Sequence, residues 1–455
     1  MQEMRFVDLF AGLGGFRLAL ERLGHECVFA SEIDGTLQEV YNRNFSEGPA
    51  IHGDIRRSKV HVPPHDILCA GFPCQPFSKS GAQTGLKDKT SGTLFHEILA
   101  ILRVRKPMYV ILENVGNFER HDGGRTWCIV KTSLEDLGYE VRGTEHMASG
   151  GDGLLSPHHL GYPHHRERFF AVASLGGLPK EPFPPRKRSA LTSMTRIVQK
   201  SAELSESDHN ETRIADHHRR CIEHWNSFLE ALPEEKVTLP SFPIWGDEID
   251  ATYSYEETTP WAQLLAAVFG FAYSKNGKVS TRKDFDALPS YARREVTEFP
   301  DWKVRYIKSN RDWFASIRGN LSQEWLSGLH TFPPSLRKLE WNCQGEDRDL
   351  WKYILQFRPS GLRVKRYTNS PSLVAMTITQ IPILGPEQRH LSKVEGLRLQ
   401  GFKDDFCVPE SRTETFKALG NAVHVDVVYA IAKRLLRVEE SNKGRASSHV
   451  AVDTS

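Results

Sequence analysis

The sequence lacks a long apolar run, a paired cysteine motif and an internal repeat. No stretch approaches the roughly 18 uncharged apolar residues that a membrane span needs, and the beginning MQEMRFVDLF has no signal-peptide pattern. We therefore expect a soluble, cytoplasmic protein. The seven cysteines are scattered without a C-x-x-C spacing, which favours reduced thiols over disulfides or a metal site.

An excess of one charge is also missing. The formal charge is +2 over 455 residues, so a nucleic-acid surface would have to be a local basic face rather than a property of the whole chain. The chain is 39% hydrophobic and 25% charged, which is the composition of an ordinary globular protein with room for two or three domains.

Short β-branched runs alternate with helical stretches from residue 4 to about 175. This alternation is typical of a parallel sheet covered by helices, so we predict an α/β fold with a Rossmann-like sheet and helices on both faces. Gly24 and Gly138 close two of the helices. The predicted strands are Arg5–Phe10, Cys27–Ala30, Asp66–Ala70, Met108–Leu112 and Arg168–Ala173, and the predicted helices are Phe16–Leu23, Thr36–Arg43, Leu94–Val104 and Thr126–Leu137.

The amino-acid composition changes at residues 176–190, which are rich in prolines, glycines and basic residues and cannot continue a regular helix or strand. Residues 190–350 are rich in charge and Trp, with helical fragments such as Asp216–Ala231 and Asp312–Leu326. Order returns over residues 388–437, which end in a predicted helix, His424–Leu436. We therefore predict an α/β domain split between 1–180 and 386–438, a separate domain at 181–385 and a disordered tail at 439–455.

A glycine-rich turn, AGLGGF, follows the first predicted strand directly after Phe10. Ligands of doubly wound folds bind at the carboxyl ends of the strands, where glycines let the backbone approach closely. The spacing G-x-G-G is not the dinucleotide fingerprint. A tight connection that holds no ligand explains this turn equally well.

Acidic residues follow the next two strand positions. Glu32 comes about twenty residues after the glycine turn, where such folds bind ribose hydroxyls, and Asp54 could accept a hydrogen bond from an adenine amino group. Together they favour an adenosine-containing cofactor. The alternative is that Asp34 and Asp54 are helix caps or turn residues, as most loop aspartates are.

Cys74 is the cysteine that departs from inert packing, the default for Cys69, Cys128 and Cys407. It follows a predicted buried strand and lies in the run GFPCQPFS, where two prolines stiffen the loop. The polar, glycine-rich segment SKSGAQTGLKDKTSG comes next and is of the kind that closes over a substrate.

The following strand, MYVILEN, ends in Glu113, so a carboxylate emerges at the same edge of the sheet as the Cys74 thiol. A cysteine that adds to carbon 6 of cytosine needs negative charge drained from the ring, and a protonated carboxyl at ring nitrogen 3 can do this. This role requires a raised Glu113 pKa in a closed pocket. Carbon 5 could then take a methyl group from a sulfonium.

Arg166 and Arg168 stand at alternate positions in HHRERFF, entering a strand. One interpretation is that they anchor the cysteine loop and the carboxylate, with Arg168 near the base carbonyl. The other is that they are solvated or phosphate-contacting arginines.

An ordered series of motifs resembles the cytosine-5 DNA methyltransferase family: DLFAGLGGF, GFPCQPFS, SGTLF, ENV, RER, RHLSKVEGLRLQGF and GNAV. The resemblance covers roughly residues 4–175 and 388–437. It implies an S-adenosylmethionine-dependent enzyme whose catalytic domain is split, with a C-terminal helix that returns to complete the sheet. The middle segment is then the target recognition domain.

The resemblance also implies roles for single residues. Phe10 would stack on the adenine, Glu32 would bind the ribose, Ile33 would cover the other adenine face and Asp54 would meet the adenine amino group. The remaining expected cofactor residues are Gly12, Leu13, Gly14, Gly15, Ile55, Pro73, Leu94, Asn421 and Val423. The chain departs from the family pattern at His164, where Gln is usual, and at Ile33, where an aromatic residue is common.

An enzyme of this type has to flip its target base out of duplex DNA, at a cost of a few kcal/mol that contacts to the opened duplex offset. The loop after Cys74, with Ser78, is the natural clamp. Residues 357–382 contain no acid, which suits phosphate contact or guanine readout, and an exposed basic loop is the alternative. The expected DNA-binding residues there are Arg358, Arg363, Lys365 and Arg366. The basic run at 186–188 is a second candidate or a solvated linker.

We therefore expect a monomeric DNA methyltransferase, the modification enzyme of a restriction-modification system, and a cognate endonuclease is compatible with this role. A methyltransferase of the same fold that acts on transfer RNA would have a much smaller central insert. A catalytically silent relative that binds DNA or a partner methyltransferase would not need Cys74, Glu113 and Arg168 intact.

Overall fold

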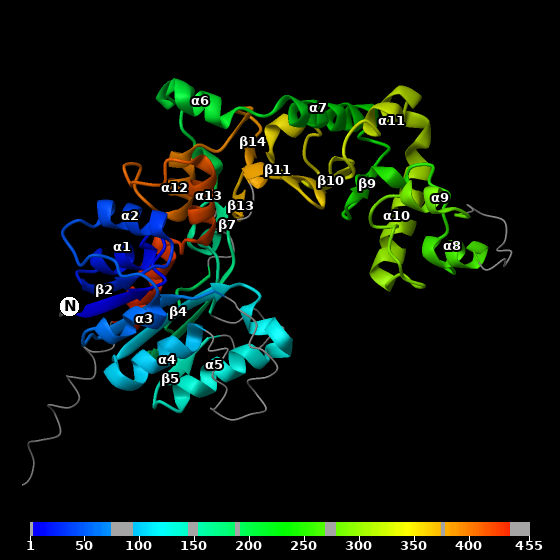
Figure 1. Ribbon diagram of the computed structural model, residues 1–455. Coiled ribbons are helices and arrows are strands. Elements are labelled where there is room, and N and C mark those ends of the chain that lie inside the picture. Colours follow the sequence, from blue (N-terminus) through cyan, green and yellow to red (C-terminus); the bar gives the residue numbers. More distant parts are fainter. Residues whose placement is uncertain are drawn as a thin grey trace, which may run out of the picture. The chain divides into compact units, whose positions relative to one another are not determined.

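The computed structural model describes residues 3–73, 94–143, 153–186, 192–268, 279–374 and 378–436. The chain divides into two compact units (Figure 1). Unit 1 comprises residues 1–205, 368–378 and 392–455, and unit 2 comprises residues 206–367 and 379–391. No helix among the described residues combines the length and the apolar character that crossing a membrane takes.

Unit 1 is built on a seven-stranded sheet in the order β2-β1-β3-β4-β8-β5, with β6 also paired to β8. Its strands are β1 Arg5–Leu9, β2 Glu26–Ser31, β3 Ile67–Gly71, β4 Tyr109–Val115, β5 Glu140–Arg142, β6 Leu154–Leu155 and β8 Arg168–Ser174, and a separate pair joins β7 His164–His165 to β13 Ser370–Pro371. Its helices are α1 Gly15–Glu21, α2 Gly35–Asn44, α3 Ile55–Ser58, α4 Leu94–Arg105, α5 Arg125–Glu135, α12 Lys393–Gln400, α13 Arg412–Asn421 and α14 Val425–Leu435.

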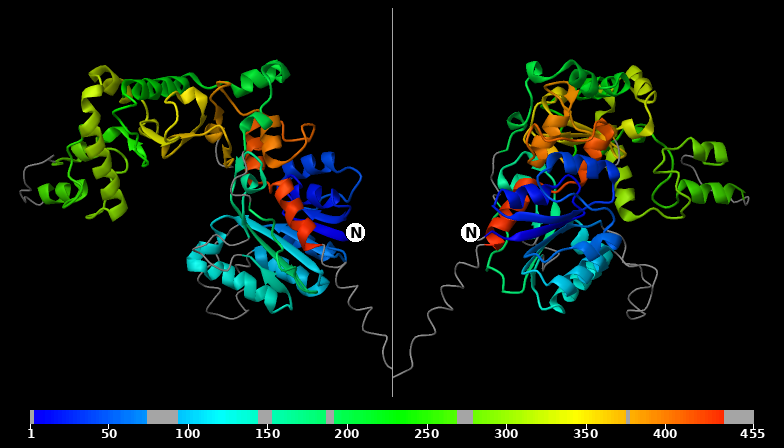
Figure 2. Two further views of the ribbon diagram at one scale, coloured as in Figure 1. Left: turned by 180° about the vertical axis from the view of Figure 1, so that it is seen from behind. Right: turned by 60° about the vertical axis from the view of Figure 1, so that its left-hand side comes forward.

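Helices cover this sheet as the alternating pattern predicts. Val7, Leu68 and Val110 pack in one apolar core with residues of α4 and α5. On the other side of β1, the buried Asp8 lies near Arg17 of α1. The C-terminal α14, red in Figures 1 and 2, lies beside α1 although the two are about 400 residues apart, and an ion pair of 2.8 Å joins Arg22 to Asp426.

The direction of β8 corrects the expectation of an all-parallel sheet. Strands β1 to β4 are parallel, whereas β8 is antiparallel to β4 and also pairs antiparallel with β5. The chain returns from β5 and enters β8 at the edge where β4 ends, so Arg168 lies opposite Val115. Consequently the start of β8 and the ends of β3 and β4 meet at one edge, where Gly71 pairs with Glu113.

The first segment of unit 1 ends at residue 205, whereas the change in composition predicts a domain boundary near residue 180. Pro182, Phe183 and Pro184 are buried, and the backbone N–H of Gln199 donates to the Glu395 carboxylate at 2.8 Å. The proline-rich stretch therefore packs as part of unit 1. Residues 368–378 also belong to unit 1, and the chain finally returns to it at residue 392. The predicted tail lies outside the described residues.

Unit 2 contains a six-stranded sheet in the order β15-β14-β11-β12-β10-β9. Its core gathers Trp225 and Phe228 of α7 with Leu339, Leu355 and Leu362 of the sheet. The strands are β9 Ile244–Trp245, β10 Lys338–Asn342, β11 Ile354–Arg358, β12 Gly361–Lys365, β14 Ile383–Leu384 and β15 Arg389–His390, and the helices are α6 Glu206–Thr212, α7 Asp216–Ala231, α8 Pro260–Val268, α9 Arg282–Asp286, α10 Asp301–Ile317 and α11 Gln323–Leu329.

Two helix predictions in unit 2 have different outcomes. The predicted helix Asp216–Ala231 is confirmed as α7. The predicted helix Asp312–Leu326 is wrong, because α10 ends at Ile317 and α11 begins at Gln323. Ser322 interrupts the pattern by accepting a hydrogen bond from the backbone N–H of Trp325, which makes it the N-cap of a new helix.

Candidate active site

A cavity of about 450 Å³ lies at the carboxyl edge of the sheet of unit 1. This is the place where open α/β sheets bind ligands. It brings together many of the residues predicted from the sequence, and the predicted residues that line it are Phe10, Gly12, Glu32, Ile33, Pro73, Leu94, Glu113, Arg168, Asn421 and Val423.

The glycine turn shapes one wall of the cavity. Phe10 and Gly12 have φ of 59° and 55°, a left-handed conformation that is uncommon for a residue such as Phe and costs free energy. Gly12 is partly exposed and faces the cavity, whereas Leu13, Gly14 and Gly15 are buried and are not among the lining residues. These three residues therefore support the turn from behind.

Glu32 is held in place by the same turn. Its carboxylate accepts hydrogen bonds from the backbone N–H groups of Gly12 and Asp34, each at 3.0 Å. Each carboxylate oxygen has a second lone pair, so Glu32 can still accept from hydroxyl donors in the cavity. Beside it, the Ile33 side chain is 65% exposed although it lines the cavity.

Asp34 and Asp54 are both N-caps, as the alternative interpretation of these aspartates stated. Asp34 accepts from the backbone N–H groups of Thr36 and Leu37 at the start of α2. Asp54 caps α3 and forms an ion pair of 2.6 Å with Arg56, whose hydrogen bond lowers the pKa of Asp54. Like Leu13, Gly14 and Gly15, the predicted cofactor residues Asp54 and Ile55 do not line the cavity.

Glu113 and Arg168 form the polar end of the cavity. The Arg168 Nε lies 3.2 Å from the Glu113 Oε1, and only 9% of the Glu113 side chain is exposed. Burial raises the pKa of Glu113, and the positive charges of Arg168 and Arg166 oppose that rise. The raised pKa that the sequence argument requires is therefore present, and its cause is desolvation.

Arg166 has a different task from Arg168. Its side chain is buried, and one guanidinium nitrogen donates to the backbone carbonyls of Gly420 and Ala422 at 2.7 and 2.9 Å. Arg166 does not line the cavity, and it supports the segment 420–423, which does. No sequence pattern indicates this link, because the partners are backbone atoms 254 and 256 residues away.

Asn114 is a site residue that the sequence analysis did not single out. Its side-chain nitrogen donates to the backbone carbonyl of Phe72 at 2.9 Å, so the end of β4 holds the chain two residues before position 74. Pro73 lines the cavity. Cys74 and Ser78 lie outside the described residues, and Cys74 is bonded directly to Pro73 in the chain.

The four predicted DNA-binding residues of unit 2 lie on or beside a strand pair, and not in the exposed loop that was the alternative interpretation. Arg358 ends β11, and Arg363 and Lys365 lie on β12. Acids from elsewhere in unit 2 reach two of the four, because Arg363 pairs with Glu340 at 2.6 Å and Arg366 pairs with Glu346 at 2.9 Å.

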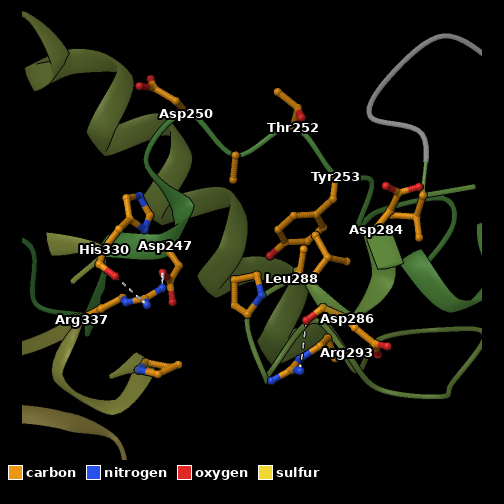
Figure 3. A pocket seen from close by; sticks show the side chains of 15 residues that line it. Asp247, Asp250, Thr252, Tyr253, Asp284, Asp286, Leu288, Arg293, His330 and Arg337 are labelled. Carbon is orange, nitrogen blue, oxygen red and sulfur yellow. Dashed lines mark hydrogen bonds and ion pairs between the residues drawn. The ribbon is translucent and has the colours of Figure 1, made fainter. Parts of the chain in front are cut away.

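A second cavity, of about 600 Å³, lies in unit 2 (Figure 3). Figure 3 shows Asp247 beside Arg337, and the two form an ion pair of 3.0 Å. The other carboxylates along its wall are also engaged: Asp250 with Arg318, Asp284 with Thr281 and Asp286 with Arg282. Each of these carboxylates has at least one ion-pair or hydrogen-bond partner, although the second oxygen of Asp247 has none, so this cavity is a weaker candidate for chemistry than the one in unit 1.

This chain is similar to known proteins over almost its whole length. The profile of the family "C-5 cytosine-specific DNA methylase" matches residues 4–437. The chain is 33% identical to the Type II methyltransferase M.AluI of Cellulosimicrobium cellulans, over 95% of this chain and 92% of that protein. It is 42% identical to the Type II methyltransferase M.NlaX of Neisseria lactamica, over 95% of this chain and 96% of that protein.

Among solved structures, a putative DNA modification methyltransferase encoded within an E. coli prophage aligns with a TM-score of 0.48 and 16% identity. The alignment covers 96% of this chain and 100% of that one.

Proposed function

Because this chain belongs to the C-5 cytosine-specific DNA methylase family and is a DNA (cytosine-5-)-methyltransferase, we propose that Cys74 is its nucleophile and Glu113 its acid. The observation that carries this proposal is the pairing of Gly71 with Glu113 across β3 and β4. It sets the chain segment that leads to Cys74 beside the end of the strand that bears the buried carboxyl.

The cavity of unit 1 fits S-adenosylmethionine, which supplies the methyl group when bound. Its volume is within the usual range for small-molecule sites, roughly 300–1,000 Å³. Phe10, Ile33 and Leu94 offer apolar surface for a purine, and Glu32 offers a fixed acceptor for ribose hydroxyls. Asn421 and Val423 belong to the wall that Arg166 supports.

The residues at the polar end would act in sequence. The Cys74 thiolate adds to carbon 6 of cytosine while protonated Glu113 supplies a proton at ring nitrogen 3, so that carbon 5 becomes nucleophilic. Arg168 orients the Glu113 carboxyl and lies within reach of the base carbonyl. After carbon 5 is methylated, a water molecule takes the proton from carbon 5 while Cys74 leaves carbon 6 as the thiolate, and ring nitrogen 3 returns its proton to Glu113, which restores the aromatic ring and the acid.

The target carbon is stacked inside duplex DNA, so we propose that the base is flipped into this cavity. Unit 2 would then be the target recognition domain, with Ser78 of unit 1 among the DNA contacts. The curated relatives are named Type II methyltransferases, which supports a modification role beside a cognate restriction endonuclease.

Bisulfite sequencing of a plasmid from cells that express the chain tests this function. We expect methylated cytosines at one fixed sequence, lost with Cys74→Ala and retained with Cys128→Ala. Cys128 is the matched control because it is an exposed thiol on α5. Methylation that persists with Cys74→Ala would contradict the proposed nucleophile.

A further inference from the structure

The sheet of unit 2 has one face in the apolar core and a second face on which charged side chains flank the buried Ile354 and Gln356. Along β10, β11 and β12, alternate residues such as Leu339, Leu355 and Val364 enter the core. Side chains point to opposite faces at successive positions of a strand, so the intervening residues share the other side. We call this the polar sheet face, and its charged members are Lys338, Glu340, Arg358, Arg363 and Lys365.

Charge is unevenly compensated on the polar sheet face. Arg363 is paired across neighbouring strands with Glu340. Within the residues that the structure describes, the other three cations, Lys338, Arg358 and Lys365, make no ion pair. The Arg358 Nε is buried without a hydrogen-bond partner, and the Lys338 ammonium lies 4.8 Å from the centre of the Tyr291 ring.

These three cations are also only partly hydrated. Each side chain belongs to a residue of intermediate exposure, and desolvation lowers the pKa of all three, with Arg363 adding to the effect at Arg358 and Lys365. Asp247 is the acid that acts on Lys338, and Glu340 acts on Arg358. A cation that has lost water without gaining an anion costs free energy, which an anionic ligand would recover.

The spacing of these cations suits a polyanion rather than a single anion. Arg358 pairs with Gly361 at one end of β12, and Lys365 ends that strand four residues later. Four residues of strand span about 13 Å, which is the rise of about four base pairs of duplex DNA. Lys338 begins the neighbouring β10 at the Gly361 end, where its backbone lies against that glycine.

We propose that Lys338 and Arg358 bind backbone phosphates of duplex DNA at one point and that Lys365 binds a phosphate about four base pairs further on, while Glu340 holds Arg363 out of that role. This inference rests on the proposed function of unit 2 as the DNA-recognising unit. It divides the basic residues of unit 2 into those that bind phosphates and those that do not. Arg366, exposed and paired with Glu346, does not belong to the phosphate-binding set, whereas Lys338 joins it.

The test is the salt dependence of DNA binding by the full chain, measured by fluorescence anisotropy with a labelled random-sequence 40-base-pair duplex. The slope of log K against log salt is negative, and each lost phosphate contact reduces its magnitude by about 0.9. If the affinity at 1 M salt is unchanged, this corresponds to an affinity that is about eightfold weaker at 0.1 M salt. We expect Arg358→Gln and Lys365→Gln each to show this loss and the triple variant with Lys338→Gln to show about three times the slope change. Lys365→Arg keeps the positive charge and should therefore retain the slope of the wild type.

Lys352→Gln and Arg318→Gln are the matched controls, because they remove the same charge from exposed ion pairs of unit 2. Their slopes should equal that of the wild type. Equal slope changes in controls and test variants, or none in the test variants, would overturn the phosphate assignment. Thermal unfolding identifies any variant that fails to fold, and the slopes of the variants that do fold then decide. No methyl transfer is measured, so the outcome is independent of whether Cys74 is the nucleophile.

Discussion

The Nε of Arg168 lies 3.2 Å from the Oε1 of Glu113, although the two residues come from strands of opposite direction. Glu113 is near the end of β4 and Arg168 begins β8, so both reach the same edge of the sheet. The Arg168 guanidinium fixes the orientation of the Glu113 carboxyl, and burial raises the pKa of Glu113 against the opposing charges of Arg168 and Arg166. Both properties suit a group that donates a proton to a nucleobase in the cavity.

Replacing Glu113 by Gln should separate catalysis from folding. We expect single-turnover methyl transfer to fall by at least about 100-fold, the usual scale of general acid catalysis, with duplex affinity changed less than about threefold. The pKa of Glu113 is raised in the folded state, so its ionised form costs stability as pH rises above the unfolded value. Glu113→Gln should therefore keep or raise the melting temperature at pH 8. Parallel losses of transfer and of binding would instead make Glu113 a structural residue.

Replacing Gly15 should weaken cofactor binding, because Gly15 packs against Val423 in the wall of the cavity. A Cβ at this position would lie 2.7 Å from Cγ2 of Val423 and 2.8 Å from its carbonyl oxygen. Gly15→Ala must therefore displace Val423, at a cost of about 1–3 kcal/mol for an overpacked site. Calorimetry should show at least a tenfold weaker affinity for S-adenosylmethionine.

Gly35→Ala is the control for that substitution. Gly35 also begins a helix, and nothing lies within 4 Å of a Cβ built there. We expect unchanged affinity and a slightly more stable protein. If both alanine variants bind the cofactor like the wild type, Val423 does not form part of the site.

Buried His424 should make unit 1 sensitive to acid. Burial and the charge of Arg166 lower its pKa to about 4, Asp426 opposes the shift, and the neighbouring ring of His164 is 6.4 Å away. The unfolded chain takes up this proton near pH 6.5, so stability is lost as pH falls from 6.5 towards 4. At pH 5 the loss is about 2 kcal/mol by linkage.

Urea unfolding at pH 7.5 and pH 5 checks this expectation. The difference between the two midpoints should shrink with His424→Asn and stay unchanged with His61→Asn, which alters an exposed histidine of the same unit. A pH dependence that is identical in all three proteins would exclude His424 as its source.

Much of unit 1 could be predicted because its periodicity is local. The strands that begin at Arg5 and Ile67 and the helix that begins at Leu94 follow from apolar patterns and end within a few residues of the prediction. Once parallel strands are recognised, their carboxyl ends predict the cavity.

Other features of the fold depend on tertiary contacts and could not be predicted from local sequence patterns. The direction of β8 is seen only in its antiparallel pairing with β4 and β5, and the stretch up to residue 205 belongs to unit 1 through contacts such as the bond between Gln199 and Glu395. The ion pair of Arg363 with Glu340 joins residues 23 positions apart, so a search for acids near Arg363 in the sequence could not find it.

We propose that Cys74 bonds covalently to the target cytosine. The most direct measurement uses a duplex with 5-fluorocytosine at the methylated position, incubated with the enzyme and S-adenosylmethionine and resolved on a denaturing gel. Fluorine at carbon 5 blocks the final proton loss, so we predict a stable protein–DNA adduct with the wild type and with Cys128→Ala, and none with Cys74→Ala. An adduct that survives Cys74→Ala would contradict the mechanism.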